Sequence, residues 1–130
     1  MWHVKRANEF TPKSWGYESL IDNRDYCGKI LFFHKGKMGS LHYHQEKAET
    51  FFILSGRVEV DVLSLTMGPL GYEVPPDFDR QLETVLLGQG ESIYLPPGTA
   101  HRVEALYDTT IIEVSTPHKD EDTFRIVPAS

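Results

Sequence analysis

Hydrophobic and polar residues alternate with a period of two along most of this chain, and Gly or Pro interrupts the alternation at short intervals. The clearest segment is 57–63, where Val58, Val60 and Val62 alternate with charged residues. Because side chains two positions apart lie on the same face of a strand, this segment predicts a strand with one buried and one solvated face. Short strands separated by turn residues are typical of an all-β sandwich or barrel. The predicted strands cover residues 29–35, 40–44, 49–55, 57–63, 81–87, 91–96, 101–106, 110–116 and 123–127.

A single domain is the expected organisation, because 130 residues support one hydrophobic core and hardly two. We expect an N-terminal arm over about residues 1–28, a barrel over about 29–116 and a C-terminal segment with one strand over 117–130. Residues 64–80 are rich in Gly, Pro and Asp and are too long for a hairpin turn. This inserted loop is either a lid over the barrel mouth or a tolerated insertion.

Composition and charge narrow the classes of function. The chain is 40% hydrophobic and 12% aromatic, as in ordinary globular proteins. Its net charge of −6, without a basic stripe, argues against a nucleic-acid partner. The single cysteine, Cys27, cannot form an intramolecular disulfide. The first residues lack the apolar segment of a signal peptide, and no apolar run approaches the ~18 residues that span a bilayer. We therefore expect a cytoplasmic protein with a small-molecule ligand and no membrane partner.

Two histidines and a glutamate lie close together in the sequence HYHQEKAE. On a strand, His42 and His44 point to the same face. Glu49 begins the next apolar run, and a tight turn before it would bring its carboxylate beside the two imidazoles. His101 begins a later strand, so a fourth ligand can come from a neighbouring strand, and three imidazoles with one carboxylate suit a divalent metal ion. The remaining histidines are expected to be hydrogen-bonded or exposed side chains rather than ligands, namely His3, His34 and His118.

Glycine and proline residues around these ligand candidates complete a longer pattern. The string reads Gly36, five residues, His42-x-His44, four residues, Glu49, six residues and Gly56, and later Gly90, five residues, Pro96-x-Gly98, two residues and His101. This string resembles both signature motifs of the cupin family. The second motif commonly ends in Asn where this chain has Ala105. Since that Asn is not a ligand, the departure leaves the ligand set intact.

The resemblance implies the cupin-type double-stranded β-helix, a jelly-roll barrel of two antiparallel sheets. It also implies one divalent metal ion bound by His42, His44, Glu49 and His101. Manganese, iron, cobalt, nickel, copper and zinc all suit three imidazoles and a carboxylate, so the identity of the metal stays open.

Further segments resemble particular branches of the family. SWGYESL at 14–20 and IIEVSTPHKDEDTFRI at 111–126 are similar to the flanks of the cupin domain of bacterial phosphomannose isomerases. HYHQEKAE with GESIYLPPGTAH is similar to the metal site of cupin-type D-lyxose isomerases, including a lysine two residues before the glutamate. These resemblances imply a metal-dependent isomerase or epimerase acting on a sugar or sugar phosphate. A non-haem metal-dependent dioxygenase and a non-catalytic sugar-binding or regulatory cupin are the alternatives.

Lys47 and Glu49 are the candidate catalytic residues. Aldose–ketose isomerisation moves a proton between adjacent carbons and needs a general base beside the metal. If the chain is extended before Glu49, Lys47 faces the same pocket, where burial and a nearby cation would depress its pKa. The alternative is a solvated surface lysine, which leaves Glu49 or another carboxylate in the barrel as the base. Among candidate phosphate ligands, alternation puts Arg57 and Arg102 on the outer face, whereas Arg125 stays open.

Apolar residues on both faces of one predicted strand indicate a homodimer. Leu31 and Phe33 are assigned to the outer face, opposite Ile30, Phe32 and His34. A sheet with apolar side chains on both surfaces is expected to be buried against another protomer. Dimers are also what the cupin resemblance implies.

Overall fold

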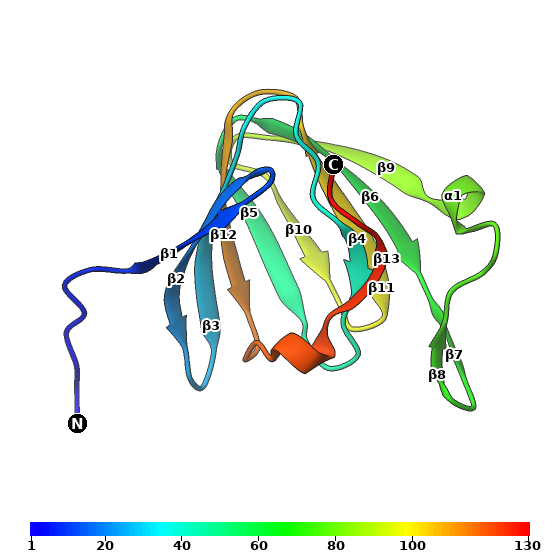
Figure 1. Cartoon of the computed structure of the whole chain (residues 1–130), viewed down its shortest axis with the longest axis horizontal. Helices are drawn as coiled ribbons and strands as arrows, with labels where there is room; N and C mark the ends of the chain where they lie inside the picture. Colours follow the sequence, from blue (N-terminus) through cyan, green and yellow to red (C-terminus); the bar gives the residue numbers. More distant parts are fainter.

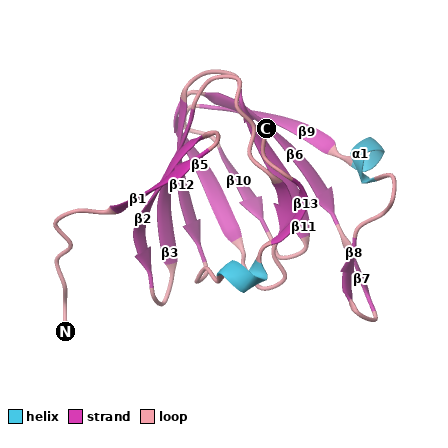
Figure 2. Cartoon of the chain, viewed as in Figure 1, coloured by secondary structure: helices cyan, strands magenta, loops and turns pink.

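Two antiparallel sheets face one another in the computed structural model, which describes residues 1–130 (Figure 1). The six-stranded sheet has the order β1-β2-β3-β12-β5-β10, and the five-stranded sheet has the order β13-β4-β11-β6-β9. A two-stranded sheet, β7-β8, lies beside them, and the only helices are two short turns (Figure 2). The elements are β1 (Glu9–Lys13), β2 (Gly16–Asn23), β3 (Cys27–Phe33), β4 (Leu41–Tyr43), β5 (Glu49–Ser55), β6 (Arg57–Ser64), β7 (Thr66–Gly68), β8 (Gly71–Glu73), α1 (Phe78–Gln81), β9 (Glu83–Gly88), β10 (Ser92–Leu95), β11 (Thr99–Ala105), β12 (Thr109–Ser115), the 3-10 helix η1 (Asp120–Asp122) and β13 (Phe124–Val127). The predicted all-β jelly-roll fold is confirmed.

All nine predicted strands are present, with ends within two residues of those expected. Four further strands were not predicted. β1 and β2 lie in residues 1–28, and every residue of β1 is exposed, so its sequence carries no alternation of buried and solvated positions. β7 and β8 lie in residues 64–80 and have three residues each, too few to display a period. No helix in the chain is long and apolar enough to cross a membrane.

The assignment of faces on β3 is wrong. Leu31 and Phe33 point inward and are buried, whereas Ile30 and Phe32 are half-buried on the opposite face. Alternation separates two sets of side chains, but it does not identify the inner set when both sets are apolar. The core is formed by buried side chains from both sheets: Leu31, Phe33, Phe51, Ile53, Val58, Val60, Leu87, Leu95, Val103, Ala105 and Ile111.

The space between the sheets contains a cavity of about 470 Å³, which is lined at one end by the β1–β2 turn and at the other by η1. At this end η1 lies between the strands of the two sheets and leads into β13 (Figure 1). The chain turns here at Gly98, whose φ of +79° favours glycine. A side chain on Gly98 would overlap the ring of Tyr72. The backbone N–H of Gly98 donates a hydrogen bond to the carbonyl oxygen of His44 over 2.8 Å. The second motif is thereby bonded directly to the first.

Candidate metal centre

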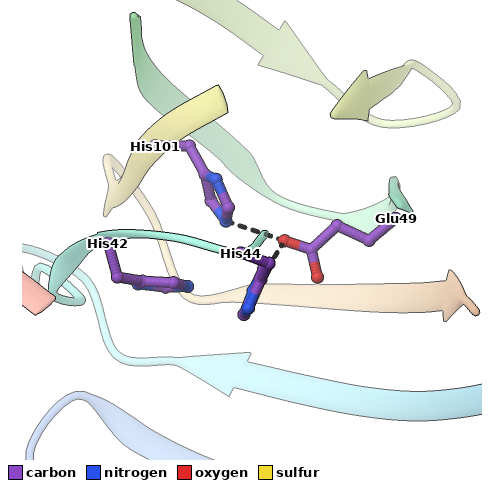
Figure 3. Close-up of side chains that lie close together, drawn as sticks. All are labelled: His42, His44, Glu49 and His101. Atoms are coloured by element: carbon purple, nitrogen blue, oxygen red, sulfur yellow. Dashed lines mark ion pairs between the residues drawn. The ribbon is translucent and has the colours of Figure 1, made fainter. Parts of the chain in front are cut away.

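The four sequence-predicted ligands meet at the floor of this cavity (Figure 3). His42 lies on β4 and His44 follows that strand directly, while Glu49 begins β5 of the opposite sheet. His101 lies on β11, directly opposite His42 in the β4–β11 pairing. One ligand atom from each of the four residues lies within 4.8 Å of the others. His44, Glu49 and His101 are buried and His42 is half-buried.

All three histidines are held in the same way, with Nδ1 bonded to a backbone carbonyl oxygen. The bonds run from Nδ1 of His42 to Ser40 O over 3.1 Å, from Nδ1 of His44 to Asp122 O over 2.9 Å, and from Nδ1 of His101 to Thr99 O over 2.9 Å. A carbonyl oxygen only accepts, so Nδ1 is the donor and each neutral ring keeps a lone pair on Nε2. Metal-binding histidines are characteristically oriented by such a bond on the second nitrogen.

Glu49 presents one carboxylate oxygen to these nitrogens. Its Oε1 lies 2.7 Å from Nε2 of His101 and 3.6 Å from Nε2 of His44. With Nδ1 as the donor, Nε2 of His101 and Oε1 of Glu49 are two acceptors in close contact, and both are buried without a hydrogen-bond partner of good geometry. A cation held by these residues would relieve the repulsion between the two atoms. Three imidazole nitrogens and a carboxylate oxygen therefore fit a divalent ion.

A proton competes with a metal ion at the same atoms. Burial alone would lower the pKa of His101, but the Glu49 carboxylate outweighs it and raises that pKa. Burial would raise the pKa of Glu49, yet the neighbouring imidazoles of His101 and His44 and the charge of Lys47 hold that pKa well below its usual value. Burial, together with charge on the other two rings, lowers the pKa of His42 well below its ordinary value. A proton on Nε2 of His101 would occupy an atom that the metal ion needs, so acid is expected to weaken metal binding.

Lys47 is buried, with 3% of its surface exposed, so the surface alternative is wrong. Its Nζ lies 3.1 Å from Oε2 of Glu49 and 2.8 Å from Oε2 of Glu113. Nδ1 of His118 lies 3.2 Å from the same ammonium group. Glu49 thus joins the histidines through one oxygen and Lys47 through the other.

The expected depression of the Lys47 pKa is also wrong. Burial lowers this pKa, but the carboxylates of Glu113 and Glu49 outweigh burial and raise it. The expectation considered a neighbouring cation and did not include the second carboxylate. Lys47 is therefore a cation at neutral pH.

Glu113 on β12 was not singled out from the sequence. It is 4% exposed, and burial together with the charge of Glu49 raises its pKa against the opposing effect of Lys47 and Lys29. The signal was available in the segment Thr109–Ser115, where Glu113 has the parity of the buried Ile111. A carboxylate at an inward position of an apolar strand is rare unless it is paired.

Asp122 also escaped the sequence analysis, and it organises the loop between His44 and Glu49. Its Oδ1 accepts from the backbone N–H groups of Gln45 and Glu46 over 2.9 and 3.1 Å, and its Oδ2 accepts from that of Lys47 over 3.0 Å. Its own carbonyl accepts from Nδ1 of His44. One residue of η1 thus fixes both a ligand ring and the loop that carries the buried lysine.

Replacing Asp122 by asparagine is expected to weaken metal affinity by roughly tenfold, the lower end of the effect of losing an outer partner of a ligand. The amide keeps one acceptor oxygen, but it places an N–H₂ group against the backbone N–H groups of the loop. Competition with a chromophoric chelator measures the change. Glu121→Gln, at the exposed neighbouring position, is the matched control. Equal affinity in Asp122→Asn and the control would show that the loop is ordered without this carboxylate.

The other sequence candidates lie around this centre without joining the metal-binding group. His3 and His34 are exposed, and His118 lies in the cavity wall, where Nε2 is 3.0 Å from Oδ1 of Asp120. Arg102 donates two hydrogen bonds to Asp61 on the neighbouring strand β6. Arg125 on β13 lines the cavity.

Comparison with known proteins gives one family and a set of distant relatives. The family model described as Cupin matches residues 28–128. A mannose-1-phosphate guanylyltransferase of Sinorhizobium fredii (strain NBRC 101917 / NGR234) is 24% identical over 136 residues, covering 98% of this chain and 23% of that protein. The chain therefore spans about a quarter of this relative.

Solved structures share the fold at low sequence identity. The capsular polysaccharide assembling protein CapF from Staphylococcus aureus matches with a TM-score of 0.71 at 15% identity, over 95% of this chain and 32% of CapF. KdgF from a Halomonas species matches with a TM-score of 0.62 at 20% identity, over 81% of each chain. At these identities the likeness establishes the architecture alone.

Proposed function

Because this chain belongs to the cupin family, we propose that it binds one divalent metal ion through His42, His44, Glu49 and His101 and acts on a carbohydrate as an isomerase or epimerase. The observation that carries the proposal is the common anchoring of the three imidazoles, whose Nε2 atoms converge with Oε1 of Glu49. Manganese, iron, cobalt, nickel, copper and zinc all suit this donor set.

Carbohydrate chemistry is supported by the size and lining of the cavity. About 470 Å³ lies within the range of small-molecule sites, and most of the lining residues are polar. Of the relatives, one is named for mannose 1-phosphate and another for capsular polysaccharide. A bound ion would polarise a substrate oxygen and orient the molecule.

The residues beside the metal-binding group supply the proton chemistry in this proposal. Lys47, a cation, stabilises the negative charge that develops on a substrate oxygen. Oε1 of Glu49 would hold the metal ion, while Oε2 fixes Lys47. Glu113, whose pKa is raised, accepts the proton from one carbon and returns it to the next. This assignment places the base on a carboxylate rather than on the lysine.

A non-catalytic sugar-binding cupin is the second candidate, favoured by the closed charge network. Lys47 is shared by two carboxylates and a histidine, so each group already has a partner. A network of this kind can shape a cavity without any proton transfer.

The test is proton exchange at carbon. The metal-loaded protein is incubated in D₂O with a panel of aldoses, ketoses and their phosphates, and ¹H NMR follows loss of the C–H signal and appearance of the isomer. An isomerase or epimerase exchanges this hydrogen or interconverts the sugars without consuming oxygen. Sugar binding without exchange supports the binding module, and substrate-dependent oxygen uptake supports a dioxygenase.

We also propose that the protein is a homodimer that buries the outer face of the six-stranded sheet. Ile30, Ile112 and Phe52 lie side by side across β3, β12 and β5 on that face. Leu54 and Val114 add exposed apolar surface there. Light scattering is expected to give twice the chain mass of 14.9 kDa, and Ile112→Lys is expected to give the monomer mass. A monomer at all concentrations in the unsubstituted protein would refute the dimer.

A further inference from the structure

Arg125 occupies the position opposite the most exposed metal-ligand candidate. It pairs with His42 in the register of β13 and β4, so both side chains lie on the same face of the five-stranded sheet. Directly opposed residues in an antiparallel pair have Cβ atoms roughly 4.5–5.5 Å apart. Arg125 lines the cavity and is exposed to solvent, which places it at the rim of the cavity beside His42.

Arg125 is the one cation of the cavity lining without an acidic partner. Every other lysine or arginine of the lining has a carboxylate within 4 Å. The pairs are Lys13 with Glu18 at 3.7 Å, Lys29 with Glu18 at 2.7 Å, Lys47 with Glu113 at 2.8 Å, and Arg102 with Asp61 at 2.9 Å. Arg125 makes no ion pair and no side-chain hydrogen bond. Five guanidinium donors therefore remain available at the entrance.

The charge of the cavity differs from that of the whole chain. The chain has 13 Lys and Arg against 19 Asp and Glu, whereas the side chains that face the cavity include four of each, because Arg102 pairs with Asp61 on the outer face of the five-stranded sheet. The four cations are Lys13, Lys29, Lys47 and Arg125, and the four carboxylates are Glu18, Glu49, Glu113 and Asp120. A divalent ion at the floor would add two positive charges. The cavity of an acidic protein would then be locally positive and would attract an anion.

We propose that Arg125 recognises an oxyanion on the substrate, so that the carbohydrate is a sugar acid or a sugar phosphate rather than a neutral sugar. A guanidinium binds a carboxylate or a phosphate through two parallel hydrogen bonds, and the opposed position of His42 places the polyol end of such a ligand over the metal-binding group. This inference rests on the proposed function and specifies its substrate class.

Calorimetric titration of the metal-loaded protein with D-glucose, D-glucuronate, D-glucose 6-phosphate and inorganic phosphate tests the proposal. Arg125→Gln removes the guanidinium, and Arg57→Gln, an exposed arginine on β6 outside the cavity lining, is the matched control. We expect one of the anionic sugars to bind at least tenfold more tightly than D-glucose. This advantage is lost in Arg125→Gln and kept in Arg57→Gln, with unchanged metal content in both variants. Glucuronate and glucose 6-phosphate identify which oxyanion is recognised.

The outcomes separate this inference from the proposed function. If anionic sugars bind Arg125→Gln as tightly as they bind the unsubstituted protein, the role of Arg125 is refuted while the carbohydrate assignment stands. If no sugar of either charge binds, the carbohydrate assignment fails. Inorganic phosphate then decides the inference: binding that depends on Arg125 supports the oxyanion site, and phosphate binding that is absent or equal in Arg125→Gln overturns it.

Discussion

Replacing Lys47 by methionine is expected to lower the free energy of unfolding of the metal-free protein by about 3–5 kcal/mol, the cost of removing one partner of a buried ion pair. Methionine keeps the length of the side chain and removes its charge. Glu49 and Glu113 then face one another without the cation that lies 3.1 and 2.8 Å from them. Urea denaturation with an unchanged slope measures the difference.

The stability lost in Lys47→Met is expected to depend on pH in a definite direction. The pKa of Glu113 is raised in the folded protein because of burial and the charge of Glu49. A carboxyl with a raised folded pKa binds more protons when folded, so its effect on stability becomes less favourable as pH rises through that pKa. Removing Lys47 raises this pKa further, and the loss is expected to be larger at neutral pH than in mild acid.

Two further variants test whether the uncompensated carboxylate charge causes the loss of stability. Glu113→Gln in the Lys47→Met background removes the uncompensated charge and is expected to recover part of the lost stability. Lys35→Met, at an exposed position, is the control and should lie within about 0.5 kcal/mol of the unsubstituted protein. Lys47→Met should keep its metal and lose any sugar conversion. Stability unchanged by Lys47→Met would refute the stabilising role of the network, and unchanged turnover would refute its catalytic role.

Replacing His101 by alanine is expected to lower metal affinity by more than about 100-fold, beyond the largest effect of losing an outer partner. The change removes one of four ligand atoms and leaves Oε1 of Glu49 without the nitrogen 2.7 Å away. Competition titration measures affinity, and circular dichroism checks that the barrel is still folded.

The control for this variant is His34→Ala, since His34 is exposed and lies outside the cavity lining. His42→Ala is expected to behave like His101→Ala, because its ring is held by the same kind of bond. Full metal stoichiometry and undiminished affinity in either variant would refute the proposed ligand set.

The strands and the four-residue group were predictable because both depend on local spacing. Alternation marked nine strands, and the motif placed His42, His44 and Glu49 within eight residues. His101 entered through a second local motif and the family resemblance. β3 has apolar side chains on both faces. The alternation there did not decide whether the face of Leu31 and Phe33 or the opposite face is buried.

The surroundings of the site were not predictable because they depend on contacts between residues far apart in the chain. Asp122 bonds to the loop at Gln45 across 77 positions, and Glu113 reaches Lys47 from another strand. The charge state of Lys47 depends on these distant carboxylates. A pocket-facing lysine was therefore one open alternative in the sequence, whereas its partners and the direction of its pKa required the fold.

Elemental analysis of the protein purified without chelator, before and after dialysis against EDTA and reloading, tests the central claim most directly. The account predicts one divalent metal ion per chain that is lost with EDTA and restored on reloading, since His42, His44, Glu49 and His101 form one group of four ligand atoms. Protein that contains only trace metal and takes up less than stoichiometric amounts of every tested divalent ion on reloading would contradict it.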